Sequence, residues 1–337
     1  MKFVVIRRDN IGDLVCTTPL IHALREKFPD ASIYALVNSY NRPALKNNPD
    51  IDRIYAYTKT KHRSSGQSVL SVIWDRLKMF SELRRERIDY VIIAGAHFLP
   101  RGLKLARALK PRHIIGFTDS NNSKSLQIDT GIPYTLDAPL HEAEDIFRLL
   151  KPLGIVGKPG PMRIYPDKDL LDSICKRFDP SHPVIGVHIS ARKTTNRWQE
   201  EKFVELIRKL HQENDQLQFA LFWSPGDENN PHHPGDDQKA ERIIRGLQDI
   251  PLQALPTHRL EELISFMDIC DTMICSDGGA LHIAAALGKP IVCFFGKSDA
   301  SRWYPWGVPH VLLQTETRNV ADISVNQVYQ AYSSLQD

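Results

Sequence analysis

The clearest chemical pattern in the chain is a strand, a glycine turn and a helix between residues 271 and 296. The apolar run 272–275 is typical of a buried parallel strand, and the alanine-rich stretch 280–287 predicts a helix. Gly278 and Gly279 lie between them, where they let a ligand approach the backbone and leave free N–H groups at the positive end of the helix. The pattern predicts an anion site, with phosphate as the expected ligand.

Two side chains beside this turn could act on the same ligand. Asp277 closes the strand and His282 lies on the first helical turn. Both are therefore expected at the carboxyl edge of a parallel sheet, where ligands of α/β proteins bind. Taken singly, a Gly-Gly turn is often only a turn and a helical histidine is often structural. The combination within one short segment favours a binding site.

A similar layout follows the expected strand 183–189. Cations alternate with hydroxyls just beyond it, a combination suited to a diphosphate; these residues are Ser190, Arg192, Lys193, Thr194, Thr195 and Arg197. Asp227 and Glu228 follow the next expected strand, 218–223, and could hold ribose hydroxyls. We interpret His232 and His233, in the loop beyond, as exposed residues rather than metal ligands.

One carboxylate could act as a general base. Asp13 lies on the loop after the expected first strand, 3–7, and a helix begins near Thr18. A carboxylate there could take a proton from an attacking hydroxyl, and the helix N-terminus would keep it ionised. Local sequence leaves equally open that Asp13 only stabilises the turn.

The sequence offers no metal site at these edges. Asp50 with Asp52, and Asp167 with Asp169, form D-x-D patterns, but neither pair closes a strand at the expected binding edge. The five cysteines lack metal-ligand spacing and are expected to be buried free thiols. Without a P-loop or a G-x-G-x-x-G motif, kinases and dehydrogenases are disfavoured. We expect neither a metal nor a cofactor.

Length and element pattern predict two α/β domains, 1–157 and 158–337. A proline- and glycine-rich stretch, 153–162, separates them. Each is expected to be Rossmann-like, with a parallel sheet covered by helices, and the two to face one another across a cleft. The last helix, 325–334, could pack back on the first domain. The expected strands are 3–7, 32–37, 53–57, 89–95 and 113–117, then 183–189, 218–223, 272–275, 291–295 and 310–313.

The net charge of +3 hides an asymmetry. Residues 1–160 contain 25 Lys and Arg against 16 Asp and Glu, whereas the remainder contains 18 against 24. Most of the excess lies in 55–113, which includes Arg84, Arg85, Arg101 and Lys104. Such a face attracts anions over about 8–10 Å at physiological salt. Nucleic acid, anionic lipid or an acidic glycolipid could bind to such a face. The alternative is a solvated helix surface that binds no partner.

Composition and the first residues point to the cytoplasm. With 42% hydrophobic and 25% charged residues, the chain has the composition of a soluble globular protein. It lacks the long apolar run of a membrane span and the apolar core of a secretory signal.

Together these residues resemble glycosyltransferase family 9, the ADP-heptose:lipopolysaccharide heptosyltransferases. The resemblance spans both domains and rests on Asp13 after Ile-Gly, on Trp198 after arginine, and on the segment 276–290. It implies a GT-B fold, with the acceptor bound mainly by the first domain and the nucleotide sugar by the second. It also implies metal-independent transfer with inversion at the anomeric carbon. The family's general base falls on Asp13, and its donor-binding residues fall on Asp277 and His282.

Two positions depart from the family's pattern. Asn196 stands where members often carry lysine, so Arg192 or Lys193 is expected to supply that charge. Gly278 replaces a serine or threonine, which removes one hydroxyl from the donor site. Both departures leave the donor sugar open.

The sequence thus predicts an inverting enzyme that moves heptose from ADP-heptose to the inner core of a lipopolysaccharide precursor. It would be peripheral on the cytoplasmic face of the inner membrane, without nucleic acid as a partner. Another nucleotide sugar, another acceptor, or a non-catalytic binding platform are the alternatives. The expected donor-binding residues are Ser190, Arg192, Lys193, Thr194, Arg197, Asp227, Glu228, Asp277, Gly278, Gly279 and His282, and the expected acceptor-binding residues are Arg84, Arg85, Arg101 and Lys104.

Overall fold

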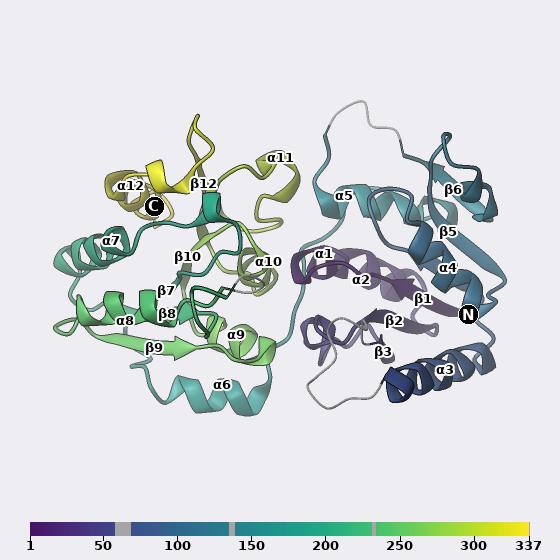
Figure 1. Ribbon diagram of the computed structural model, residues 1–337, viewed down its shortest axis with the longest axis horizontal. Helices are drawn as coiled ribbons and strands as arrows, with labels where there is room; N and C mark the ends of the chain where they lie inside the picture. The colour runs from purple at the N-terminus through teal and green to yellow at the C-terminus, as the bar shows by residue number, and fades with distance from the viewer. Residues whose placement is uncertain (58–68, 135–138, 231–233, 337) are drawn as a thin grey trace. The chain divides into compact units, whose positions relative to one another are not determined.

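The computed structural model describes residues 1–57, 69–134, 139–230 and 234–336. It divides the chain into two compact units, Met1–Met162 (unit 1) and Arg163–Asp337 (unit 2), drawn in Figure 1. The division lies at the end of the proline- and glycine-rich stretch that the sequence singled out as the boundary.

Unit 1 is a six-stranded parallel sheet in the order β3-β2-β1-β4-β5-β6. The expected strands are present, and a sixth, β6, was missed because its residues Thr-Gly-Ile-Pro form no apolar run. The strands are β1 (Lys2–Ile6), β2 (Ser32–Asn38), β3 (Arg53–Tyr57), β4 (Tyr90–Ile93), β5 (His113–Thr118) and β6 (Thr130–Pro133). The α-helices are α1 (Ile11–Val15), α2 (Thr18–Lys27), α3 (Val69–Arg85), α4 (Pro100–Leu109) and α5 (Glu142–Phe147).

Unit 2 repeats this architecture, with its six parallel strands in the order β12-β11-β10-β7-β8-β9. Here β9 was missed, because its residues Leu-Gln-Ala-Leu-Pro form no continuous apolar run. The strands are β7 (Val184–His188), β8 (Gln218–Trp223), β9 (Leu252–Pro256), β10 (Thr272–Ser276), β11 (Ile291–Phe295) and β12 (His310–Gln314). The α-helices are α6 (Lys168–Cys175), α7 (Glu200–Glu213), α8 (Asp237–Arg245), α9 (Leu260–Met267), α10 (Gly279–Ala286), α11 (Ala300–Trp303) and α12 (Val325–Ser333).

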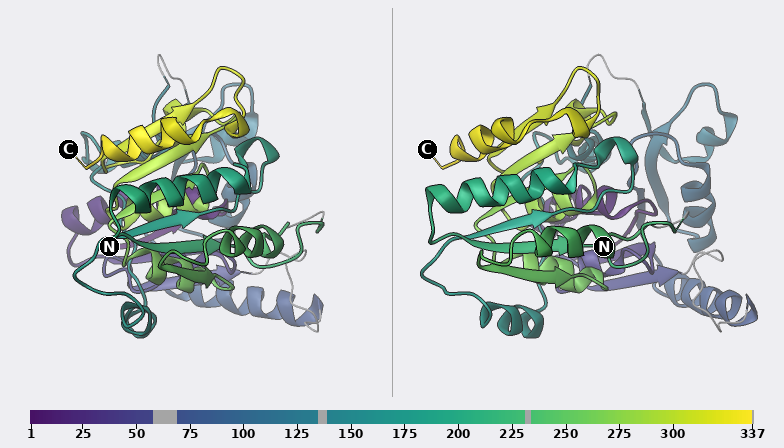
Figure 2. Two further views of the ribbon diagram at one scale, coloured as in Figure 1. Left: turned by 90° about the vertical axis from the view of Figure 1, so that its left-hand side faces the viewer. Right: turned by 60° about the vertical axis from the view of Figure 1, so that its left-hand side comes forward.

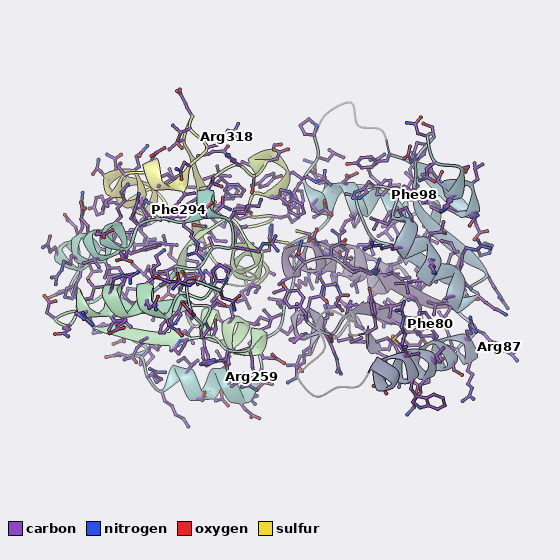
Figure 3. All side chains as sticks on the ribbon, viewed as in Figure 1. Phe80, Arg87, Phe98, Arg259, Phe294 and Arg318 are labelled. Atoms are coloured by element: carbon purple, nitrogen blue, oxygen red, sulfur yellow. The ribbon has the colours of Figure 1, made fainter. Side chains whose placement is uncertain are left out.

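Both sheets are buried on two faces, which explains why their central strands are continuous apolar runs. Val4 and Ile6 of β1 belong to one core cluster, and Phe3 and Val5 point into another. Phe98 in unit 1 and Phe294 in unit 2, both labelled in Figure 3, lie in the cores of their units. The expected α/β class is confirmed.

The strand order places a binding edge in each unit. In unit 1 the order reverses at β1, which pairs with both β2 and β4. In unit 2 it reverses at β7, which pairs with both β8 and β10. Ligands of such sheets bind outside the carboxyl ends of the strands at this reversal. The segments there are those after β1 and β4, and those after β7 and β10.

The last helix, α12, belongs to unit 2. Its buried residues Val325, Val328 and Ala331 are part of the core of unit 2. Figures 1 and 2 show α12 lying beside α7, with which it is in contact. The apolar face of α12 therefore completes the helical layer of its own sheet.

Candidate active site

Asp13 is held by three hydrogen bonds just beyond β1. It lies in the first turn of the short helix α1 and not in a loop as expected. The backbone N–H and the side-chain amide of Asn10 each donate to its Oδ2 at 3.0 Å, and Nη2 of Arg7 donates to its Oδ1 at 2.7 Å. The side chain is 15% exposed. The result is a fixed carboxylate that solvent still reaches.

Arg7 ties Asp13 to two other segments of unit 1. This arginine directly follows β1 and is buried. Its Nη1 donates to the carbonyl of Ala94, just beyond β4, at 2.7 Å. Its Nη2 also donates to Oε1 of the buried Glu142, the first residue of α5, at 2.7 Å. Sequence analysis assigned no role to Arg7, since its partner Glu142 is far away in the chain.

The charges around Asp13 keep it ionised. Burial alone would raise the pKa of Asp13, but the positive charge of Arg7 and the hydrogen bonds from Asn10 lower it below its ordinary value. Burial would likewise lower the pKa of Arg7, but Glu142 and Asp13 raise it. Asp13 is therefore a carboxylate at neutral pH, held so by Arg7 and Asn10.

In unit 2, the carboxylate of Asp277 links the loops that follow β7, β10 and β11 at the carboxyl edge of the sheet. Oδ2 of Asp277, after β10, accepts from the amide of Asn196 at 3.1 Å. It also accepts from the hydroxyl of Ser298, after β11, at 2.5 Å. Nζ of Lys193, after β7, donates to the same hydroxyl at 3.0 Å. Lys193, Ser298, Asp277 and Asn196 thus form one hydrogen-bonded group, which we call the Asp277 network.

The two departures from the family's pattern have clear structural settings. Asn196 lies in the 3-10 turn η5 (Thr194–Asn196) and is 2% exposed, so it binds the protein rather than solvent. Lys193 is exposed and places a cation beside Asp277. Gly278 caps α10 with an extended backbone, φ 163°. A Cβ there would meet its nearest atom, the oxygen of Ser276, at 4.0 Å. A hydroxyl side chain would therefore fit at this position.

His282 is buried within unit 2. It lies on α10, is 3% exposed, and packs edge-on against Trp303 of α11, with ring centroids 5.8 Å apart.

The other predicted donor residues hold neighbouring loops together. Ser190 accepts from the backbone N–H of Ser224 at 2.9 Å, which links the segments after β7 and β8. Arg197 donates to the carbonyl of Ala191 at 2.8 Å. Arg192 and Thr194 are exposed. Asp227 accepts from Asn229 within its own loop, and Glu228 pairs with Arg242 at 3.3 Å. None of the described hydrogen bonds joins Asp227 or Glu228 to the Asp277 network.

The D-x-D residues are structural, as the sequence indicated. Asp50 binds His22 at 2.9 Å, and Asp52 binds Arg25 at 2.7 Å. Asp167 caps α6. Across the described residues, no group of three or more His, Cys, Asp and Glu could hold a metal ion. His232 and His233 lie outside those residues. All five cysteines are free, and Cys175 is exposed.

The four predicted acceptor-binding cations do not form one site. Arg84 and Arg85 end α3, and the next residue, Glu86, pairs with Lys2 at 2.5 Å. Because Lys2 begins β1 and Asp13 follows its other end, these arginines lie at the amino edge, away from Asp13. Arg87, labelled in Figure 3, follows them.

Arg101 and Lys104 are exposed on α4, which begins after β4 at the carboxyl edge. Three further cations of the basic stretch, Lys59, Lys61 and Arg63, lie outside the described residues. None of the described helices is long and apolar enough to cross a membrane.

Comparison with known proteins gives consistent matches along the chain. The model of glycosyltransferase family 9 (heptosyltransferase) matches residues 76–333. Lipopolysaccharide heptosyltransferase 3 of Escherichia coli is 27% identical over 304 residues, which are 88% of this chain and 82% of the relative. The solved ADP-heptose lipopolysaccharide heptosyltransferase II of E. coli is 20% identical, with a TM-score of 0.78 and coverage of 99% and 98%.

A second E. coli heptosyltransferase, solved with ADP-2-deoxy-2-fluoro heptose, is 19% identical, with a TM-score of 0.74 and coverage of 99% of both chains. At these identities the likeness concerns the fold. Both units of this chain therefore have the Rossmann-like architecture of the GT-B class.

Proposed function

Because the chain belongs to glycosyltransferase family 9, we propose that it transfers heptose from ADP-heptose to the inner core of a lipopolysaccharide precursor. The transfer inverts the anomeric carbon and needs no metal ion. The observation that carries this proposal is the ionised carboxylate of Asp13, fixed at the binding edge of unit 1 by Arg7 and Asn10. The names of the similar heptosyltransferases support the choice of donor and acceptor.

Asp13 acts as the general base. A carboxylate offers roughly four lone-pair positions, and the three described hydrogen bonds use one on Oδ1 and two on Oδ2. The acceptor hydroxyl donates to the remaining position on Oδ1. As its oxygen bonds to the anomeric carbon, its proton passes to Asp13 and the bond from that carbon to the phosphate oxygen breaks. ADP departs with the electron pair.

Unit 2 stabilises the departing diphosphate. Lys193 supplies a positive charge beside the Asp277 network, and the N-terminus of α10 supplies free N–H groups next to it. Arg192 is exposed on the same segment. Asp277 holds this site together through Asn196 and Ser298 and does not itself face the negative diphosphate. The carboxylate of Asp277 and the diphosphate can therefore lie at the same carboxyl edge of the sheet, because Asp277 binds protein groups and the cations and N–H groups bind the diphosphate.

A donor-binding measurement and a transfer assay together test this function. Calorimetry with ADP-heptose should detect binding, and labelled heptose should pass from it to heptose-deficient lipopolysaccharide. Tight binding without transfer to any acceptor would instead support the platform alternative, which the substitutions at Asn196 and Gly278 suggest.

Chelation is expected to leave the transfer rate unchanged. The cationic side chains and the start of α10 take the place that a divalent ion holds in metal-dependent transferases. The initial rate should be equal with EDTA and with added Mg²⁺ or Mn²⁺. Loss of transfer in EDTA, with recovery on adding either ion, would refute this account of the leaving group.

Reversal of the basic face should weaken binding to anionic vesicles. Arg84, Arg85, Arg101 and Lys104 are exposed, and each contributes about 1 kcal/mol near such a surface. Exposed apolar side chains on α3 (Ile73, Trp74 and Leu77) could add interfacial contact. Changing the four cations to Glu should reduce vesicle binding and use of a membrane-bound acceptor, while the Kd for ADP-heptose stays the same.

The matched control reverses Lys168, the first residue of α6, and Lys176, which follows this helix in unit 2. This variant should bind vesicles as the parent does. Binding by the parent should also fall steeply with added salt. Salt-insensitive binding, or weaker donor binding in the four-residue variant, would assign the basic face another role.

A further inference from the structure

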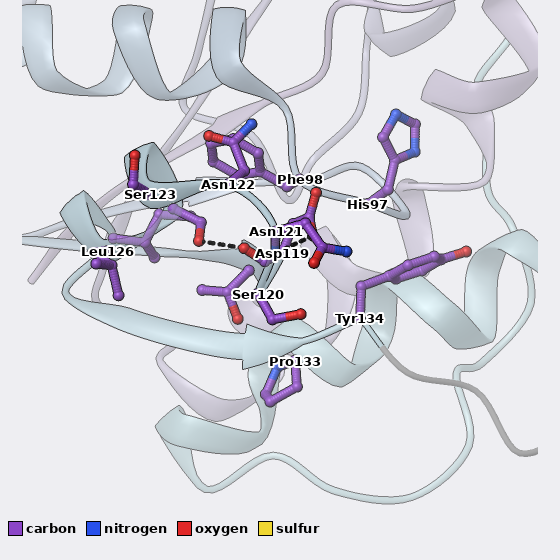
Figure 4. Close-up of a pocket in the computed structure, with 13 residues that line it drawn as sticks. His97, Phe98, Asp119, Ser120, Asn121, Asn122, Ser123, Leu126, Pro133 and Tyr134 are labelled. Atoms are coloured by element: carbon purple, nitrogen blue, oxygen red, sulfur yellow. Dashed lines mark hydrogen bonds between the residues drawn. The ribbon is translucent and has the colours of Figure 1, made fainter.

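Unit 1 contains a pocket of ≈ 980 Å³ at the same sheet edge as Asp13. It lies where β4, β5 and β6 end, and Figure 4 shows the side chains around it. β4 pairs directly with β1, which precedes Asp13. Arg7 binds both Asp13 and the carbonyl of Ala94, only three positions before the pocket residue His97. The pocket therefore begins one strand away from the proposed base.

The polar lining of this pocket is uncharged apart from one carboxylate. Its amides and hydroxyls both donate and accept hydrogen bonds; they come from Thr118, Ser120, Asn121, Asn122, Ser123 and Ser125. Asp119 is the charged exception, and no Lys or Arg is among the described residues that line the pocket. A phosphate or carboxylate would meet a negative charge there without a cation to balance it. The lining favours a ligand that is rich in hydroxyls and carries no charge.

Aromatic rings provide an apolar wall for the same ligand. Figure 4 shows His97 and Tyr134 on one side of the pocket, with Asn122 and Ser123 on the other. The Tyr134 ring packs edge-on against Phe117, with centroids 5.4 Å apart. It lies 6.4 Å from the ring of His97. An aromatic face beside hydrogen-bonding groups matches a sugar ring, which has an apolar face and a rim of hydroxyls.

The loop after β5 is ordered before any ligand arrives. The carboxylate of Asp119 accepts from the backbone N–H of Asn121 at 2.9 Å. The carbonyl of Asp119 accepts from the hydroxyl of the buried Ser125 at 2.9 Å. The side chain of Asn122 caps the following turn by accepting from Lys124. Such a loop loses little conformational freedom on binding, which favours recognition of a specific ligand.

We propose that this pocket binds an uncharged sugar unit of the acceptor. The inference rests on the proposed function and deepens it. The sugar that enters the pocket is neutral, and phosphate or carboxylate groups of the acceptor remain outside it. Selection for a neutral sugar beside Asp13 would then decide which acceptors the enzyme uses, independently of the basic face on α3 and α4.

Binding of two acceptor fragments to the full chain tests this proposal. The probes are a core oligosaccharide whose heptose carries no phosphate and the same oligosaccharide with a phosphate on that heptose, measured by calorimetry without donor. We expect the dephosphorylated probe to bind more tightly. Tyr134→Ala should weaken its binding about three- to tenfold, the range of one aromatic contact. Ser120→Lys should shift the preference towards the phosphorylated probe.

The control is Tyr40→Ala, which removes an exposed tyrosine of unit 1 outside the pocket and should bind both probes as the parent does. Circular dichroism and ADP-heptose binding verify that each variant is folded. Equal or tighter binding of the phosphorylated probe by the parent, or an unchanged Kd in Tyr134→Ala, would overturn the proposal. Heptose transfer by the parent could still be observed in that case, so the test of the pocket and the test of the enzymatic function have separate outcomes.

Discussion

Asp13→Asn is expected to lower kcat about 10²- to 10⁴-fold, the range for loss of a general base. Asparagine has nearly the same shape but cannot take the proton of the attacking hydroxyl. Binding of ADP-heptose, assigned to unit 2, should be unchanged. Single-turnover rates at saturating donor, together with calorimetry, separate the two effects.

Asp9→Asn is the matched control for this change. Asp9 also faces Arg7, at 3.3 Å from its Nε, but its side chain is 40% exposed. Its loss should alter kcat little, since Arg7 keeps Asp13 and Glu142. A near-normal rate in Asp13→Asn, or an equal loss in both variants, would remove Asp13 from the role of base.

The dependence of the transfer rate on pH should also show that Asp13 is the base. A base acts only when deprotonated, and the pKa of Asp13 lies below its ordinary value because Arg7 and Asn10 outweigh the effect of burial. The rate should therefore stay level as the pH falls from 8 to about 5 and decline only below about pH 4. An acid limb near pH 6 would point to a different base.

Asp277→Ala is expected to weaken ADP-heptose binding about 10- to 100-fold. The change removes the carboxylate that accepts from both Asn196 and Ser298. Asn196 keeps its 3.1 Å hydrogen bond to the backbone carbonyl of residue 277, and each partner that is lost costs about 1–3 kcal/mol. Lys193 would lose its fixed position through Ser298. Calorimetry with ADP-heptose and with ADP measures the effect.

Asp271→Ala provides the comparison at the other end of β10. Asp271 accepts from the backbone N–H of Val184 at 2.7 Å, so it too joins β10 to β7, but at the amino edge. This variant should lose stability in thermal unfolding while it binds ADP-heptose normally. Comparable loss of donor affinity in both variants would mean that the Asp277 network supports the sheet rather than the donor.

Most of the fold follows from local sequence. Central strands such as β1 and β10 are short apolar runs buried on both faces. This pattern can be recognised in the sequence without knowing which strands lie beside them. The edge strands β6 and β9 were missed because their sequences, Thr-Gly-Ile-Pro and Leu-Gln-Ala-Leu-Pro, form no continuous apolar run. Pairing with β5 and β8, and not their own composition, makes them strands.

The site was only partly predictable, because sequence motifs show local groups and not distant partners. Asp13 and Asp277 stand in recognisable motifs. Arg7 and Glu142, by contrast, lie 135 positions apart and meet only in the folded unit. Asn196 looked like a lost lysine, but its amide bridges the loops after β7 and β10. The sequence also did not show at which edge of the sheet the basic residues would lie. In the fold, Arg84 and Arg85 lie at the edge away from Asp13.

The measurement that tests the central claim most directly is the initial rate of transfer from a panel of nucleotide sugars. The purified full chain receives heptose-deficient lipopolysaccharide with ADP-heptose, or with UDP- and GDP-linked hexoses. Mass spectrometry measures the mass gained by the product, and NMR gives the anomeric configuration of the new linkage. We predict a gain of one heptosyl residue with ADP-heptose, with inverted anomeric configuration, and no comparable gain with the others. Faster transfer from another donor, retained configuration, or no transfer at all would contradict the account.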